Sequence, residues 1–191
     1  MRLKSLAGQV ARAFVLALFG VLLLPCAPAS AQSRDLKEVR ARADESLKAF
    51  LDADFNRVVE LTYPTVIEAM GGKERMVLFL TVAQIEMTAE PGEISFSTDA
   101  PEKIIRAGTK LVAIVPTTVK VRIPEGTGTT KSFLIGVSDA RGKRKWTFIG
   151  GSYLEKADLK TLLPEAAGKI VLPKQPEPVF EKAGEGPGAP D

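Results

Sequence analysis

The sequence predicts an α+β fold in which N-terminal helices pack on a curved antiparallel β-sheet. Two observations predict it. Between residues 35 and 88, apolar residues recur at steps of three and four, which is typical of amphipathic helices. After Pro91-Gly92, apolar and polar residues alternate in runs rich in β-branched side chains, which is typical of strands. Helices and strands that are segregated along a chain indicate α+β rather than alternating α/β architecture.

Residues 1–31 have the composition of a secretory signal peptide. A basic start is followed by the uncharged, mostly apolar stretch 13–24 and by the small-residue cleavage site at residues 29–31. One alternative is a membrane anchor, but a spanning helix needs about 20 apolar residues. Another is a lipoprotein lipidated at Cys26, which the preceding Pro25 disfavours. We therefore expect export from a Gram-negative bacterium to the periplasm or the medium.

Removing this leader changes the charge balance. The full chain has 26 basic and 23 acidic residues, and residues 32–191 carry 23 of each, because three basic residues lie before residue 32. A nucleic-acid-binding domain usually has a basic face, so we expect no nucleic-acid partner. Cys26 is the only cysteine. A packed core, rather than disulfides, must therefore stabilise the exported chain.

One domain accounts for the chain that remains. Residues 32–172 are long enough for a single α+β domain with its own core. In residues 173–191, eight of nineteen residues are Pro or Gly, which predicts a flexible or extended tail.

Four helices are predicted first. Asp35 begins a helix that extends to residue 52, Asp54 caps a second helix that ends at residue 62, and Pro64 suits the first turn of a third piece. The predicted ranges are 35–52, 55–62, 64–70 and 73–88. The last is apolar on several sides, so we expect other parts of the protein to cover it on more than one side.

Two adjacent glycines separate the third and fourth helices. A phosphate-binding loop would follow a strand, whereas Gly71 and Gly72 follow a helix. Gly71 fits the left-handed position that ends a helix, and Gly72 fits the N-cap of the next one. This interpretation predicts that Gly71→Val destabilises the fold and that Gly72→Ser is nearly neutral.

The strands are predicted to form an antiparallel meander. Pro116 interrupts the longest run, so we expect a bulge or an edge position there. Glycines predict a turn at residues 126–128, and Gly142 predicts a left-handed residue in the hairpin connection 139–143. The predicted strands are 94–98, 103–106, 110–123, 132–138 and 145–153, and a closing helical turn is predicted at 158–166.

The chain contains "LKAFLDADFNRVVELTYPTVIEAMGG" near the start and "GVSDARGKRKWTFIGG" near the end. These two segments resemble the nuclear transport factor 2-like superfamily (the SnoaL-like, cystatin-like cone), in its uncharacterised exported bacterial form. The resemblance spans roughly residues 35–165 and depends on architecture rather than on catalytic motifs. It implies a cone-shaped pocket between helices and sheet. Members include isomerases, dehydratases and polyketide cyclases as well as binding and assembly modules, so the fold does not decide the function.

The missing residue types limit the chemistry. The chain has no histidine and no cysteine beyond Cys26, so the exported part has no imidazole base and no thiolate. Zinc sites built from nitrogen and sulfur ligands are excluded. We expect no metal, no cofactor and no catalytic residue, although a carboxylate working with a tyrosine stays open as an alternative.

The candidates for lining the pocket are Tyr63, Glu68, Phe133, Trp146 and Phe148. In a catalytic interpretation, Glu68 or Glu60 is a buried base beside the Tyr63 phenol. The alternative is that both glutamates are solvated and Tyr63 packs half-buried, which we favour because no spacing rule makes them converge. The three other aromatic residues can line a pocket or fill the core, and we favour the core.

The hairpin connection carries a cluster of basic residues. Arg141, Lys143, Arg144 and Lys145 can contact an anionic partner, a lipid or a glycan, or form a solvated turn, which we favour. Asp139 can bind a hard cation but is more typical of a turn.

Three hypotheses for the function follow. We favour a non-enzymatic ligand-binding or protein-interaction module, with an apolar small molecule or an envelope protein as partner and with the option of a homodimer. The others are a small isomerase or hydratase, and a structural component of an envelope assembly.

Overall fold

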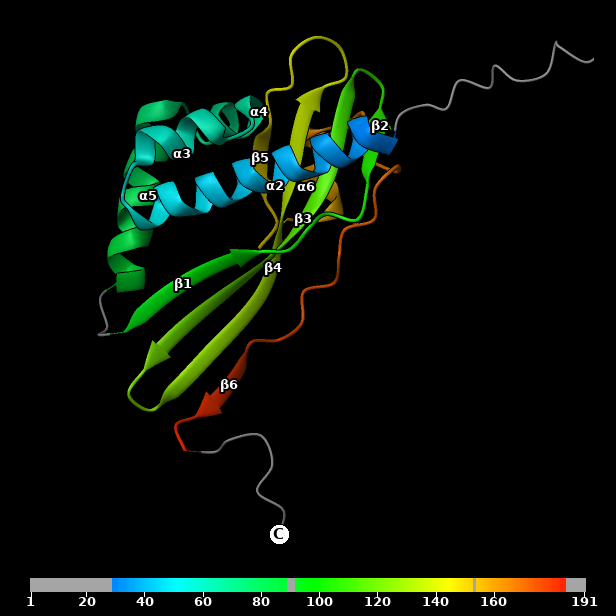
Figure 1. The fold of residues 1–191 in the computed structure, drawn as a ribbon. Helices are drawn as coiled ribbons and strands as arrows, with labels where there is room; N and C mark the ends of the chain where they lie inside the picture. Colours follow the sequence, from blue (N-terminus) through cyan, green and yellow to red (C-terminus); the bar gives the residue numbers. More distant parts are fainter. Residues whose placement is uncertain (1–28, 89–91, 153, 185–191) are drawn as a thin grey trace, which may run out of the picture. The chain divides into compact units, whose positions relative to one another are not determined.

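Helices come first in the chain and strands follow, so the predicted α+β class is confirmed (Figure 1). The computed structural model describes residues 29–88, 92–152 and 154–184. The predicted signal peptide lies almost wholly outside the described residues, as do Tyr153 and the end of the tail, and export stays a prediction. The described elements are α2 (Ala29–Leu51), α3 (Phe55–Leu61), α4 (Pro64–Ala69), α5 (Lys73–Thr88), β1 (Glu93–Thr98), β2 (Ile104–Ala107), β3 (Lys110–Ile123), β4 (Gly126–Asp139), β5 (Thr147–Gly150), α6 (Lys156–Leu162) and β6 (Val179–Lys182).

The sheet is built around the long hairpin of β3 and β4. Its register is continuous from Lys110 opposite Asp139 to Ile123 opposite Gly126. Strands β1 and β2 pair with the other edge of β3, and β5 and β6 pair with the other edge of β4, all of them antiparallel. The result is a six-stranded antiparallel open sheet.

The turn between β3 and β4 differs from the prediction. It falls at residues 124–125, and the glycines at 126 and 128 belong to β4. A Cβ at Gly126 would collide with the Glu181 carbonyl oxygen and lie 2.8 Å from the Phe180 ring. Gly126 therefore makes room for the close approach of β6, whereas a Cβ at Gly128 would lie at an ordinary contact distance of 3.9 Å from Phe180.

Pro116 occupies an edge position without a bulge. It lies opposite Phe133 in the unbroken register with β4. On its other side it falls between the part of β3 that pairs with β2 and the part that pairs with β1. Its carbonyl oxygen accepts a hydrogen bond from the Asp99 backbone N–H at 2.9 Å. Because no ladder bond is needed from its nitrogen there, proline is tolerated inside a long strand.

Helices cover the sheet on both faces where β3 begins. On one face, α2 and α3 pack against alternate residues of β3; this cluster includes Val39, Ala43, Leu61, Leu111, Ala113 and Val115. On the other face, α6 and the segment after it contribute to a second cluster, which includes Leu159, Leu163, Ile170, Val112, Ile135 and Val137. Val112 is therefore as fully buried as its neighbours on the opposite side of the strand.

The N-terminal helices begin and end close to the predicted residues, with one exception. The Asp54 side chain accepts the Arg57 backbone N–H at 3.1 Å, and Pro64 occupies the first turn of α4. Helix α2, however, begins at Ala29, so Asp35 lies inside it and caps nothing. Its carboxylate instead accepts a hydrogen bond from Arg144 Nε at 3.2 Å.

The double glycine closes α4 with a Schellman motif. Gly71 N–H donates to the Glu68 carbonyl at 3.0 Å and Gly72 N–H donates to the Ile67 carbonyl at 2.9 Å. Gly71 has φ +85°, as predicted, and the Gly72 carbonyl accepts the first bond of α5 from Met76. Gly72 also has a positive φ, +106°. The prediction that serine is neutral at position 72 is therefore wrong, because an L side chain is strained in this conformation.

We expect Gly71→Val and Gly72→Ser each to lower the free energy of unfolding by about 1–2 kcal/mol, the usual cost of a left-handed L residue. A Cβ at Gly71 would also lie 2.8 Å from Arg75 Cδ, so that side chain must move. Chemical denaturation followed by circular dichroism measures both changes. Ala69→Ser, at an exposed helical position, is the control. A Gly72→Ser protein as stable as the control would contradict the strained backbone.

Helix α5 is covered on one side only, which corrects the expectation of cover on several sides. Met76 and Leu80 are buried against residues of α2 and α3. Four large apolar side chains of the same helix are exposed: Leu78, Phe79, Val82 and Ile85. Across the described part of the chain, no helix combines the length and the apolar composition that a membrane span requires.

The described part of the Pro- and Gly-rich segment, residues 173–184, contributes a strand that the sequence pattern did not predict. In β6, Val179 lies opposite Thr129 and Lys182 lies opposite Gly126. The Ala183 backbone N–H donates to the Glu125 carbonyl at 2.8 Å, just beyond the strand. This pairing covers one edge of β4 at the turn end of the long hairpin.

Candidate functional site

The three aromatic candidates lie in the core and do not share a pocket. Phe133, Trp146 and Phe148 are each at most 4% exposed. Phe133 belongs to the cluster with α6, whereas Trp146 and Phe148 belong to the cluster with α2. They fill two core clusters, which is the packing role favoured from the sequence.

Tyr63 and Glu68 do not converge on one site. Tyr63 is half-buried just before α4, and its backbone N–H donates to the Phe148 carbonyl at 2.9 Å. Its side chain helps to line a hollow of about 270 Å³ that also includes Lys110 and Asp139. Glu68 is exposed on α4. A buried base beside the phenol is therefore not formed by this pair.

Asp139 pairs with a lysine from the neighbouring strand. Its Oδ1 lies 2.7 Å from Lys110 Nζ, and this hydrogen bond raises the pKa of Lys110. Among residues 29–88, 92–152 and 154–184, no three His, Cys, Asp or Glu side chains come together as a metal site. Asp139 thus acts as an ion-pair residue beside the hairpin connection.

A basic cleft lies beside the hairpin connection. We call residues 140–146 the β4–β5 loop, and the hollow of about 740 Å³ beside it the basic cleft. Residues of α2, α3, α4 and α5 form one side, and the loop and the start of β5 form the other. Six basic side chains and one acidic side chain line it: Arg42, Arg57, Lys73, Lys143, Arg144, Lys145 and Glu60.

Acidic neighbours already neutralise the arginines of the basic cleft. Glu45 accepts hydrogen bonds from Arg57 Nε at 2.8 Å and from Arg42 Nη1 at 2.7 Å. The bond from Arg57, followed by that from Arg42, lowers the pKa of Glu45, and the bonds to Glu45 and Glu60 raise the pKa of Arg57. Together with the pair between Arg144 and Asp35, these contacts fix the arginines in structural roles.

The lysines of the basic cleft, unlike its arginines, are not neutralised by acidic residues of the described chain. Lys73, Lys143 and Lys145 form no ion pair with any described residue. All three are exposed. The cleft therefore presents three cations that are available to a ligand.

Trp146 forms part of the wall of the basic cleft and carries the one buried, unpartnered polar side-chain atom of the described residues. Its side chain is 2% exposed, and its Nε1 has no hydrogen-bond partner there. A buried donor without a partner costs about 1–3 kcal/mol. Trp146 therefore lies at the boundary between the core and the basic cleft.

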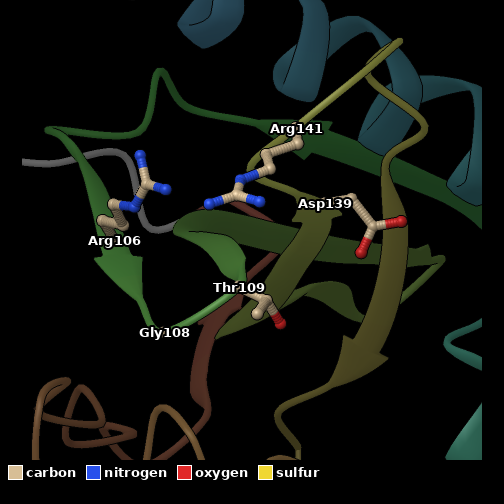
Figure 2. A pocket seen from close by; sticks show the side chains of 5 residues that line it. All are labelled: Arg106, Gly108, Thr109, Asp139 and Arg141. Atoms are coloured by element: carbon tan, nitrogen blue, oxygen red, sulfur yellow. The ribbon is translucent and has the colours of Figure 1, made fainter.

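A second hollow, of about 290 Å³, also borders the β4–β5 loop, at Arg141. In this two-arginine hollow, Arg106 from β2 and Arg141 from the loop point toward one another (Figure 2). The Asp139 carboxylate points away from them. Neither arginine forms an ion pair with a described residue. Two guanidinium groups that face one hollow can donate paired hydrogen bonds to the oxygen atoms of a carboxylate or phosphate.

Backbone and side-chain bonds hold the β4–β5 loop in place. Gly142 has φ +80°, which confirms the left-handed position predicted for it. The Ala140 N–H donates to the Thr109 carbonyl at 2.8 Å, and the Lys145 N–H donates to Ser138 Oγ at 3.0 Å. The bases on the loop are thus presented by a backbone tied to the turn between β2 and β3 and to β4.

Reasoning from the sequence found the bases of the loop but missed Arg106 and Lys73. These residues come from distant segments, and only the register of β2, β3 and β4 and the position of α5 place them around the loop. Comparison with protein-family models, with curated proteins and with solved structures finds no match for the chain. The proposal for its function therefore depends on the geometry of the site.

Proposed function

We propose that the protein is a non-catalytic interaction module that binds carboxylate or phosphate groups of an anionic partner around the β4–β5 loop. One observation carries the proposal. Five cations without an ion pair among the described residues gather beside one loop: Lys73, Arg106, Arg141, Lys143 and Lys145. Residues 32–191 carry equal numbers of basic and acidic residues, so this gathering is a local feature. Local positive charge attracts anionic partners and steers their approach.

The surroundings of Tyr63 favour binding over catalysis. A catalytic carboxylate is typically buried, so that its proton affinity suits the reaction. The carboxylate in the Tyr63 hollow, that of Asp139, is 67% exposed and paired with Lys110. The buried polar residues of the described chain are all threonine or serine. We therefore rank an isomerase or hydratase below a binding module.

We also propose the nuclear transport factor 2-like superfamily as the fold group of the chain. The order of elements supports it, because helices precede a sheet whose central hairpin they cover. In this proposal the space between the N-terminal helices and the sheet that would be a cone-shaped pocket is filled by Trp146 and Phe148, while Phe133 packs on the opposite face of the sheet. Binding then takes place at the basic loop outside the core.

The experiment is a titration with a labelled poly-glutamate peptide, followed by fluorescence anisotropy at low and high salt. We expect Arg106→Glu/Arg141→Glu and Lys143→Glu/Lys145→Glu each to weaken binding about tenfold, because a charged hydrogen bond contributes about 1.5–3 kcal/mol and less when exposed. Wild-type affinity should fall as salt rises.

The matched control is Lys120→Glu/Lys131→Glu, which changes the net charge by the same amount. Lys120 lies ten residues along β3 from Lys110, or about 33 Å for an extended strand. We expect this variant to keep most of the affinity. Equal weakening in all three variants would show a general effect of net charge and would overturn the proposed site.

A further inference from the structure

Helix α5 presents an apolar stripe to solvent. Leu78 is 64% exposed, Phe79 57%, Val82 46% and Ile85 62%. At 100° per residue, Leu78, Val82 and Ile85 lie on the side opposite Met76 and Leu80, which anchor the helix to the core, and Phe79 lies on the flank between the two sides. Contiguous exposed apolar patches on soluble proteins usually mark an interaction site.

The spacing along this stripe is that of a helix–helix seam. Arg75, Leu78, Val82 and Ile85 follow one another at steps of three, four and three residues, which is the a/d pattern of paired helices. Phe79 and Glu86 border the seam on one side. A second helix with the same spacing would fit knobs into the holes between these residues.

The charged residues at the two ends of the seam favour a second copy of α5 as the partner and an antiparallel orientation of the two helices. Arg75 and Glu86 are both exposed and form no ion pair with a described residue. When a second α5 packs antiparallel about a two-fold axis between Phe79 and Val82, Arg75 lies opposite Glu86 of the second copy at both ends. A parallel arrangement would instead bring like charges together.

The apolar surface continues beside α5. Phe79 also lines a hollow of about 580 Å³ with Val66, Met70, Ile149 and Leu162. A standard stable interface buries about 800 Å² per partner, and a single exposed patch of a few hundred Å² falls short of that. Because the stripe adjoins this hollow at Phe79, a second copy meets more apolar surface than the stripe alone provides, and we expect a dimer with micromolar affinity.

We propose that α5 is the interface of a homodimer in which two copies of the helix pack antiparallel across a two-fold axis. The inference goes beyond the anion-binding function, because the stripe includes none of the five cations assigned to the ligand. In a two-fold interface both copies contribute the same surface, so every contact between them occurs twice. The pair between Arg75 of one copy and Glu86 of the other meets this condition, because it forms once at each end of the seam.

Sedimentation velocity over a range of protein concentrations tests the dimer. We expect the wild type to dimerise with a micromolar Kd, and Val82→Asp to raise the Kd at least about tenfold by placing a charge at the centre of the seam. Val171→Asp, at a position that is 88% exposed elsewhere, is the matched control and should leave the Kd unchanged. Thermal melts of both variants show whether the monomer stays folded.

A charge exchange tests the direction of the helices. Arg75→Glu alone places a second carboxylate opposite Glu86 and should weaken the dimer several-fold, and Arg75→Glu/Glu86→Arg should restore it. A wild type that stays monomeric, a Kd unaffected by Val82→Asp, or no restoration in the double variant would overturn the antiparallel dimer. Poly-glutamate binding by Val82→Asp is measured alongside, so that failure of the dimer and failure of the anion site are distinguished.

Discussion

Gly136→Val is expected to lower the free energy of unfolding by more than about 3 kcal/mol, which is a large part of the stability of a typical domain. Gly136 lies near the C-terminal end of β4, where Val39 of α2 packs on the sheet. A Cβ there would lie 2.6 Å from Val39 Cγ2, 3.3 Å from Phe148 and 3.4 Å from Trp146. Val39 is fully buried and β-branched, so it has essentially one helical rotamer and cannot turn away.

Urea denaturation of Gly136→Ala gives the same test if the valine variant does not fold. We expect a loss of about 1–3 kcal/mol for the single methyl group. Val39→Ala removes the closest atom, so in the double variant the alanine at position 136 should cost less than it does alone. Gly150→Ala is the control, because its Cβ would meet no atom within 4 Å. Equal costs at positions 136 and 150 would contradict the close approach of α2 to β4.

The parts of the fold that the sequence predicted are those in which single residues decide the local structure. Asp54, Pro64 and Gly71 set helix ends through a side-chain acceptor, a missing N–H and a left-handed φ. Such signals act within a few residues and need no tertiary context. Helices α3 and α5 and strand β3 accordingly end at, or within one residue of, the predicted positions.

The predictions from local patterns were wrong at residues that contact a distant segment of the chain. The glycines at 126 and 128 look like a turn, but both lie in β4, and Gly126 makes room for Phe180 and the backbone of β6. Asp35 looks like a helix cap, but it pairs with Arg144. Alternation and capping patterns contain no information about which distant segment approaches a residue, so these features could not be predicted from the local sequence.

The candidate site contains residues that the local sequence indicates and residues that only tertiary packing brings there. Arg141, Lys143 and Lys145 are visible as a basic run, whereas Arg106 joins them only because β2 pairs with β3 and β3 pairs with β4. The distinction between neutralised and available cations also depends on distant partners. Arg57 is neutralised by Glu45 of α2, and nothing in the spacing of the sequence indicates that pair.

Trp146→Ala is the second substitution with a large expected effect, a loss of about 3–5 kcal/mol in the free energy of unfolding. The indole fills the cluster with Val39 and Ala43 and is 2% exposed, so its removal leaves a cavity between α2 and the sheet. Trp146→Phe should cost much less. The smaller ring loses packing contacts, but it also removes the buried N–H that has no partner among the described residues, which itself costs about 1–3 kcal/mol.

The comparison of the two variants decides what the indole nitrogen contributes. Urea denaturation followed by circular dichroism measures both, since Trp146 is the only tryptophan and its fluorescence is lost in each. A phenylalanine variant within about 1 kcal/mol of the wild type would show that the ring, and not the N–H, stabilises the core. A phenylalanine variant as unstable as the alanine variant would show instead that the N–H is bonded in solution, and it would contradict the unpartnered donor.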